Sequence, residues 1–119
     1  AQWLETRPEV ERVWYPGLES HLGHDIAARQ MHGGFGGMIS IQIAAGFEAA
    51  KKFAGATEVF TLAESLGGVE SLIEHPGAMT HASVAGTTLE VPANLIRLSV
   101  GLEDADDLIA DLEQAFRQI

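Results

Sequence analysis

The sequence predicts an α/β fold with a mixed or mostly antiparallel sheet whose helices pack mainly on one face. Segments with strand-like composition alternate along the chain with segments of helical periodicity. Several strands carry apolar and polar residues in turn, whereas the strands of a fully buried parallel sheet are apolar throughout. The length of 119 residues is that of one domain, and 46 % of the residues are hydrophobic, enough to form a core.

Four segments have the composition or the alternation of β-strands. They are residues 10–15, 36–43, 58–63 and 95–100. The first ends at Pro16 and Gly17, which favour a turn. In the last and clearest segment, Ile96 and Leu98 point to one face of the sheet, so Arg97 must point to the other.

Four further segments are expected to be helical. Residues 24–31 and 46–53 are two of them, and the residues before Pro8 resemble the end of a helix that begins upstream. The last helix is expected to begin near Asp104, whose side chain can cap its first turn. Residues 46–53 are expected to bury Phe47, Ala50, Phe53 and Ala54, and the last helix to bury Leu108, Ile109, Leu112, Phe116 and Ile119.

Composition argues against several classes of protein. There are no cysteines, which excludes disulfides and thiolate chemistry and fits a cytoplasmic protein. The 17 acidic and 7 basic residues give a net charge of −10, which would repel nucleic acids and anionic membranes. No apolar run reaches the roughly 18 residues of a membrane span, and residues 1–5 do not have the pattern of a secretory signal.

Arg97 is the first candidate for chemistry, because a guanidinium on an apolar strand is costly unless it is paired. It could form a structural ion pair with one of the many carboxylates of the chain. Alternatively, it could hold a ligand carboxylate, since its planar fork matches the two oxygens better than a lysine would. Local spacing does not choose between these two interpretations.

The glycine-rich turn that begins at Glu64 and Ser65 is the second candidate. Gly67 and Gly68 can adopt backbone angles that other residues avoid, so the segment could simply be a loop. The other interpretation is that Glu64 and Ser65 end a strand at a binding site, with the glycines allowing a ligand to approach the backbone. The pattern alone slightly favours the loop.

Other familiar motifs are incomplete. Arg97 and Ala63 occupy the positions of the first glycine of a nucleophile elbow around Ser99 and Ser65, and residues 32–37 open a strand, where a dinucleotide fingerprint would open a helix. No metal site is predicted, because nothing supplies a helix of ligands next to His21, His24 and Asp25; the other histidines are His32, His75 and His81. The spacing of Glu64, Glu70 and Glu74 does not by itself support paired-carboxylate catalysis.

Taken together, several ordered segments resemble the transsulfuration family of pyridoxal-phosphate enzymes, which includes cystathionine γ-synthase and cystathionine γ-lyase. The resemblance covers nearly the whole chain, through residues 13–18, 35–38, 60–68, 79–83 and 95–104. It implies that residues 1–119 are the small C-terminal domain of a fold-type I enzyme. The large domain, with the cofactor-linked lysine and most of the pyridoxal-phosphate site, would lie upstream, so this chain alone would be inactive.

The resemblance also implies roles for four residues. Arg97 matches the arginine that binds the substrate α-carboxylate, and Ser65 matches a serine that helps to position it and lies near the cofactor-linked lysine. Glu64 matches a position that lines the distal part of the substrate pocket, and Thr80 lies in a segment that lines the site. No residue of this chain is expected to be a catalytic group.

The activity implied is that of a cystathionine γ-synthase, which joins an activated homoserine ester to cysteine in a cytoplasmic homotetramer. Pyridoxal phosphate would supply the electron sink. Two alternatives remain: a cystathionine γ-lyase, or a non-catalytic module for amino-acid binding or dimerisation. Two departures from the family pattern concern the site: an extra glycine at residues 33–34 and a short segment at residues 83–92.

Overall fold

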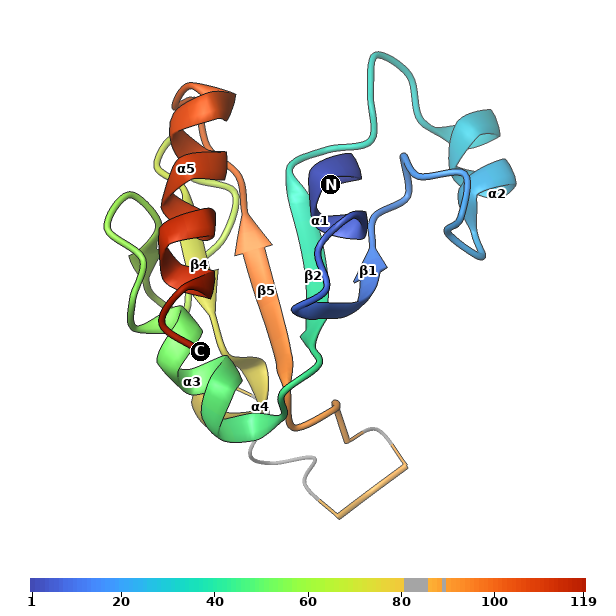
Figure 1. The fold of residues 1–119 in the computed structure, drawn as a ribbon. Coiled ribbons are helices and arrows are strands. Elements are labelled where there is room, and N and C mark those ends of the chain that lie inside the picture. Colours follow the sequence, from blue (N-terminus) through green and yellow to red (C-terminus); the bar gives the residue numbers. More distant parts are fainter. Residues whose placement is uncertain (81–85, 89) are drawn as a thin grey trace.

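The computed structural model describes residues 1–80, 86–88 and 90–119 and consists of one sheet with five helices (Figure 1). The strands are β1 (Val10–Trp14), β2 (Met38–Ile43), β3 (Thr61–Leu62), β4 (Leu72–Glu74) and β5 (Leu95–Ser99). The helices are α1 (Gln2–Glu5), α2 (His24–Gln30), α3 (Phe47–Ala54), α4 (Pro76–Met79) and α5 (Ala105–Phe116). None of the described helices is long and apolar enough to cross a membrane.

The sheet has the strand order β1-β2-β5-β4-β3. Its pairs are antiparallel except for the short parallel pair of β3 and β4, which confirms the expectation of a mixed, mostly antiparallel sheet. Helices α1, α3 and α5 lie over one face (Figure 1). Helix α2 stands away from the sheet and buries none of its residues. The other face of the central strands is therefore left without a long helix.

The core forms between this helical layer and the inward side chains of the two central strands. Ile41, Ile96 and Leu98 are completely buried. On the helical side, the ring of Phe53 from α3 stacks on that of Phe116 from α5, with centroids 4.4 Å apart. Burying each such side chain stabilises the fold by about 1.5 to 3 kcal/mol. Because strand residues alternate, the burial of Ile96 and Leu98 directs Arg97 to the opposite face.

Several predicted boundaries and burials need correction. Residues 58–63 contribute only the two-residue strand β3, and β4 was not predicted, because a three-residue strand buried on both faces has no alternation to reveal it. Phe47 begins α3 and is 41 % exposed, with its ring edge-on to that of His75. In α5, Ile109 is only partly buried, whereas Ala115 is fully buried. Ile119 lies beyond the end of α5 at Phe116 and is also only partly buried.

Asp111 is the polar residue that fixes α5 to the rest of the fold. Its side chain is 4 % exposed and accepts hydrogen bonds from the backbone N–H groups of Glu58, Val59 and Phe60 at 2.7 to 2.9 Å. The Gln114 amide donates a fourth bond at 3.1 Å. Burial by itself raises the pKa of the Asp111 carboxyl, but the backbone and amide hydrogen bonds outweigh it and hold the pKa below its ordinary value. This carboxylate therefore sets the path of the chain into β3.

We predict that Asp111→Asn lowers the free energy of unfolding by about 2 kcal/mol, because an amide is a weaker acceptor for three N–H groups. The pKa of Asp111 is lower in the folded than in the unfolded chain, so its contribution is complete above about pH 4 and is lost as the pH falls through the folded value. Urea denaturation from pH 3 to pH 7 measures both effects. The exposed Asp107 on the same helix is the control, and Asp107→Asn should cost about 0.5 kcal/mol or less. Equal losses in the two variants would contradict the role of Asp111.

Candidate functional site

A row of four residues crosses the sheet on the face without the long helices. The backbone register pairs Trp14 with Ser40, Ser40 with Arg97, and Arg97 with Glu74, on strands β1, β2, β5 and β4. Cross-strand partners have their Cβ atoms roughly 5 Å apart on the same face. Arg97 therefore has a neutral neighbour on one side and a carboxylate on the other.

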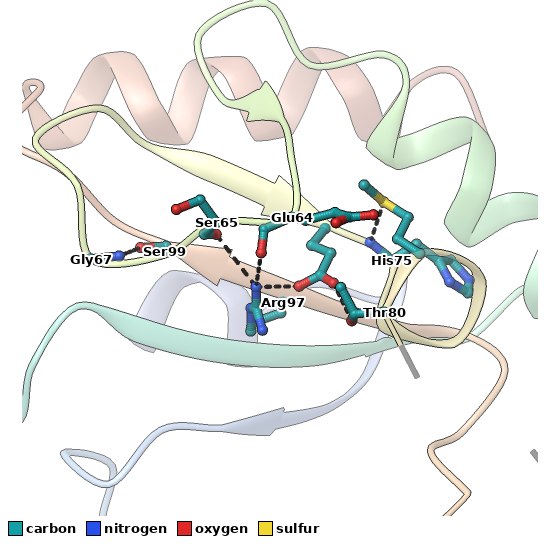
Figure 2. A network of polar contacts seen from close by, with 9 residues as sticks. Glu64, Ser65, Gly67, His75, Thr80, Arg97 and Ser99 are labelled. Atoms are coloured by element: carbon teal, nitrogen blue, oxygen red, sulfur yellow. Dashed lines mark hydrogen bonds and ion pairs between the residues drawn. The ribbon is translucent and has the colours of Figure 1, made fainter. Parts of the chain in front are cut away.

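The guanidinium of Arg97 lies toward β4 and makes three contacts there (Figure 2). Nη2 forms an ion pair with the Glu74 carboxylate and donates to the backbone carbonyl oxygens of Glu64, at 3.1 Å, and Ser65, at 3.4 Å. Within residues 1–80, 86–88 and 90–119, Nη1 and Nε have no hydrogen-bond partner. The structure thus contains the ion pair that one interpretation of Arg97 required. It also places the guanidinium beside the Glu64–Ser65 turn, which was the second candidate of the sequence.

The occupied nitrogen affects how a ligand could bind. Each two-nitrogen edge of a guanidinium includes Nη2, and Nη2 already faces three acceptors of the chain. Among the residues that the structure describes, the two N–H groups of Nη1 and the one of Nε have no acceptor. The side chain of Arg97 is 19 % exposed, so part of it is accessible to a ligand on this face of the sheet.

Glu74 is buried beneath this face. Its side chain is 1 % exposed, and the Thr80 hydroxyl donates to the carboxylate oxygen that does not meet Arg97. Between these two residues lies α4, which begins with Pro76 and is capped by His75, whose Nδ1 accepts from the Ala78 N–H at 3.1 Å. The cap fixes the single turn of helix that brings Thr80 back onto Glu74.

A hydrogen bond to β5 holds the turn after Ser65. Gly67 has a φ of +74°, a conformation that favours glycine, and its N–H donates to the Ser99 hydroxyl at 2.8 Å. Ser99 is 2 % exposed. The side chains of Glu64 and Ser65 are exposed, while their carbonyl groups point to Arg97 (Figure 2). The turn is thus tied to the strand that carries Arg97.

A second set of contacts closes the loop between this turn and β4. The Glu103 carboxylate accepts from the Ser71 N–H at 2.8 Å and from its hydroxyl at 2.7 Å, and the Ser71 oxygen accepts from the Gly101 N–H at 2.9 Å. The Ser71 N–H and hydroxyl hold the pKa of the Glu103 carboxyl below its ordinary value. A Cβ at Gly101 would lie 2.2 Å from the Val69 carbonyl oxygen, so only glycine fits there.

Figure 2 shows that the four predicted site residues, Arg97, Glu64, Ser65 and Thr80, lie close together. The backbone carbonyls of Glu64 and Ser65 contact Arg97, and both Arg97 and Thr80 contact Glu74. Glu74 itself was not predicted as part of this site. Its negative charge made it one of many possible partners for Arg97, but only the register of β4 on β5 places it beside that residue.

The histidines do not form a metal site in the described part of the chain. There, no three His, Asp or Glu side chains gather as potential ligands. His24 directs Nδ1 to the Pro16 carbonyl oxygen at 2.8 Å, which ties α2 to the turn after β1. His81, and with it part of the segments at residues 79–83 and 83–92, lies outside the described residues.

The residues of this chain do not fit a pyridoxal-phosphate site by themselves. Such a site needs a lysine to hold the cofactor covalently. The lysines of the sequence are Lys51 and Lys52, both exposed on α3. Lys51 Nζ lies 3.7 Å from the Glu48 carboxylate and 5.2 Å from the Phe47 ring centroid. Helix α3 belongs to the layer that covers the sheet face opposite to Arg97.

Comparison with known proteins identifies the family. The model of the Cys/Met metabolism PLP-dependent enzymes matches residues 1–117, and the chain belongs to this family. A cystathionine γ-synthase of Mycobacterium tuberculosis (strain ATCC 25618 / H37Rv) is 64 % identical over 115 residues, which are 97 % of this chain and 29 % of that protein. A cystathionine β-lyase of Coxiella burnetii is 54 % identical over 97 % of this chain and 30 % of that protein.

Solved structures give the same result. The crystal structure of metB from Corynebacterium glutamicum superposes with a TM-score of 0.93 at 59 % identity, over 98 % of this chain and 30 % of that one. The expected fold class is therefore correct. The chain spans about 30 % of the length of the relatives that it matches.

We predict that Ser99→Ala loosens the turn that carries the Glu64 and Ser65 carbonyls, because the Gly67 N–H loses its acceptor. Hydrogen exchange at the Gly67 amide should accelerate by about tenfold, the equivalent of one hydrogen bond of about 1 kcal/mol or slightly more. Ser40→Ala, on the neighbouring strand of the same face, should leave this amide unchanged. Unaltered exchange in Ser99→Ala would show that the turn is held by other contacts.

Proposed function

We propose that residues 1–119 are the C-terminal domain of a pyridoxal-phosphate-dependent transsulfuration enzyme, specifically a cystathionine γ-synthase, in which Arg97 binds the α-carboxylate of the amino-acid substrate. Family membership and the 64 % identity to a cystathionine γ-synthase support this activity. The relatives are about three times as long as the chain, which leaves room in the whole protein for a second, larger domain that holds the cofactor.

The observation that carries the proposal is which donors of the Arg97 guanidinium are bound within the chain and which are not. The guanidinium lies on the face of the sheet that the long helices leave free and is anchored through Nη2, and its remaining donors have no partner among the described residues. A guanidinium used only for structure would direct most of its five donors into the protein. Three donors of Arg97 have no acceptor within the described part of the chain and would be available to a ligand. Charge-assisted hydrogen bonds to a carboxylate are among the stronger polar contacts.

The other residues complete the proposed site. Nη1 would donate to one carboxylate oxygen, and the exposed hydroxyl of Ser65, at the turn that Arg97 contacts, would be available to the second oxygen and to the neighbouring cofactor. The exposed Glu64 side chain would line the distal part of the pocket. Thr80 would line the site and also bind Glu74. Fixing the carboxylate places the reacting carbon in one orientation, which lowers the entropic part of the barrier.

The pyridoxal phosphate would be bound mainly by polypeptide outside this chain, since Lys51 and Lys52 lie on the opposite layer. The exposed site would be closed by that larger domain, or by another subunit of the proposed cytoplasmic homotetramer. Within this chain, the function is to bind and orient the substrate.

One alternative activity is that of a lyase of the same family. A β-lyase is 54 % identical to this chain, so identity over this region does not separate activities within the family. A lyase would release product from cystathionine alone, whereas a γ-synthase needs cysteine together with an O-acylhomoserine. Assaying the whole protein with cysteine plus O-succinylhomoserine, and separately with cystathionine, decides between them. Activity with neither substrate, despite a bound cofactor, would contradict the proposed reaction.

We predict that Arg97→Ala in the whole enzyme raises KM for the amino-acid substrate by about 30- to 100-fold, since hydrogen bonds between charged groups contribute about 2 to 3 kcal/mol. The visible absorbance of the bound cofactor should not change, because other residues hold it. Arg117→Ala is the control, as Arg117 is 72 % exposed at the end of α5, and it should leave KM unchanged. An unaltered KM in Arg97→Ala, or loss of the cofactor band, would contradict the assigned role.

We further predict that Glu64→Ala changes the ratio of kcat/KM between two γ-substituted substrates, such as O-succinylhomoserine and O-acetylhomoserine, by about fivefold. Thermal stability should change little, since the Glu64 side chain is exposed and Arg97 binds its backbone carbonyl. Glu70→Ala, in the same exposed loop, is the control and should preserve the ratio. If both variants keep the original preference, Glu64 does not line the pocket.

A further inference from the structure

We infer that Glu74 is a positioning residue for substrate binding: it draws the Arg97 guanidinium to the Glu64–Ser65 turn and leaves Nη1 and Nε free for the substrate carboxylate. This inference rests on the proposed function, because it concerns how the same arginine is oriented. Glu74 would not touch the substrate. It would act only through Arg97.

The register of the sheet gives Arg97 two possible directions. Across β2 its partner is the neutral Ser40, and across β4 its partner is the carboxylate of Glu74. A long, flexible guanidinium is drawn to the charge, and the carbonyl oxygens of the Glu64–Ser65 turn lie on that side. Without Glu74, the two backbone carbonyls alone would have to overcome the rotamer entropy of the arginine.

Burial makes Glu74 a fixed anchor. Its side chain is 1 % exposed, and β4 is buried along its whole length. A carboxylate this deeply buried is costly unless it is paired and hydrogen-bonded, and Glu74 is bound on both sides, by Arg97 and by the Thr80 hydroxyl. Because such a side chain does not swing out to solvent, it holds Nη2 permanently, and a ligand must use the other donors.

A competing role would give the opposite result. If Glu74 occupied the arginine in place of the substrate carboxylate, its removal would free a complete two-nitrogen edge and strengthen substrate binding. The positioning role predicts weaker binding, because the free donors lose their fixed direction. The sign of the change in substrate affinity therefore separates the two roles.

The test measures carboxylate recognition in the whole cofactor-loaded enzyme. The inhibition constants of L-2-aminobutyrate and of propylamine, which differ only in the carboxylate, are compared in the unchanged enzyme and in Glu74→Gln. We expect inhibition by L-2-aminobutyrate to weaken by about tenfold and inhibition by propylamine to stay within twofold. Added to Arg97→Ala, Glu74→Gln should cause less than a further twofold loss, since a positioning residue has no effect without the group that it positions.

Unchanged or tighter binding of L-2-aminobutyrate in Glu74→Gln would overturn the inference, as would an equal loss for both inhibitors. If Arg97→Ala itself leaves the preference for L-2-aminobutyrate intact, the proposed function fails as well. If only Glu74→Gln is without effect, this inference alone fails.

A second variant covers the case in which Glu74→Gln does not fold. Thr80→Val removes one anchor of the same carboxylate and should weaken inhibition by L-2-aminobutyrate alone by about threefold, and Thr80→Ser should restore it. Absence of this selective loss would overturn the inference.

Discussion

The ion pair between Glu74 and Arg97 is the interaction on which the candidate site depends. It joins the paired strands β4 and β5, and it decides on which side of β5 the guanidinium lies. A buried ion pair adds little net stability, because desolvation offsets most of the Coulomb attraction. Its main effect here is on the direction of the side chain, since it fixes one nitrogen of the arginine beside the Glu64–Ser65 turn. The other two nitrogens have no hydrogen-bond partner among the described residues.

The fold gives this pair its setting by dividing the sheet into two unlike faces. Helices α1, α3 and α5 cover one face, where aliphatic side chains and the Phe53–Phe116 stack form the core. Polar anchors then fix the segments that lead to the other face. Asp111 holds the chain before β3, Ser99 holds the turn at Gly67, and Glu103 holds the start of β4 through Ser71. The site thus lies at the surface, whereas anchors such as Asp111 and Ser99 are buried.

The sequence alone was enough to predict those parts of the site that depend on local periodicity. Alternation in residues 95–100 placed Arg97 opposite Ile96 and Leu98, and both aliphatic residues are completely buried. The partner of Arg97 could not be predicted from the sequence, because the register between strands depends on tertiary packing. In addition, Glu74 lies in a three-residue strand without alternation. Phe47 was misplaced for a related reason: it satisfies the helical period but begins its helix, where the ring extends past the edge of the core.

The chain belongs to the Cys/Met metabolism PLP-dependent enzymes, and the proposed role of these contacts is to bind the substrate carboxylate. The most direct test is a crystal structure of the whole protein with its amino-acid substrate or a close analogue bound. The predicted result is that the α-carboxylate accepts from Nη1 of Arg97 while Nη2 remains on Glu74 and the carbonyls of the Glu64–Ser65 turn. A carboxylate bound elsewhere, or Nη1 occupied by a carboxylate of the protein itself, would contradict this account.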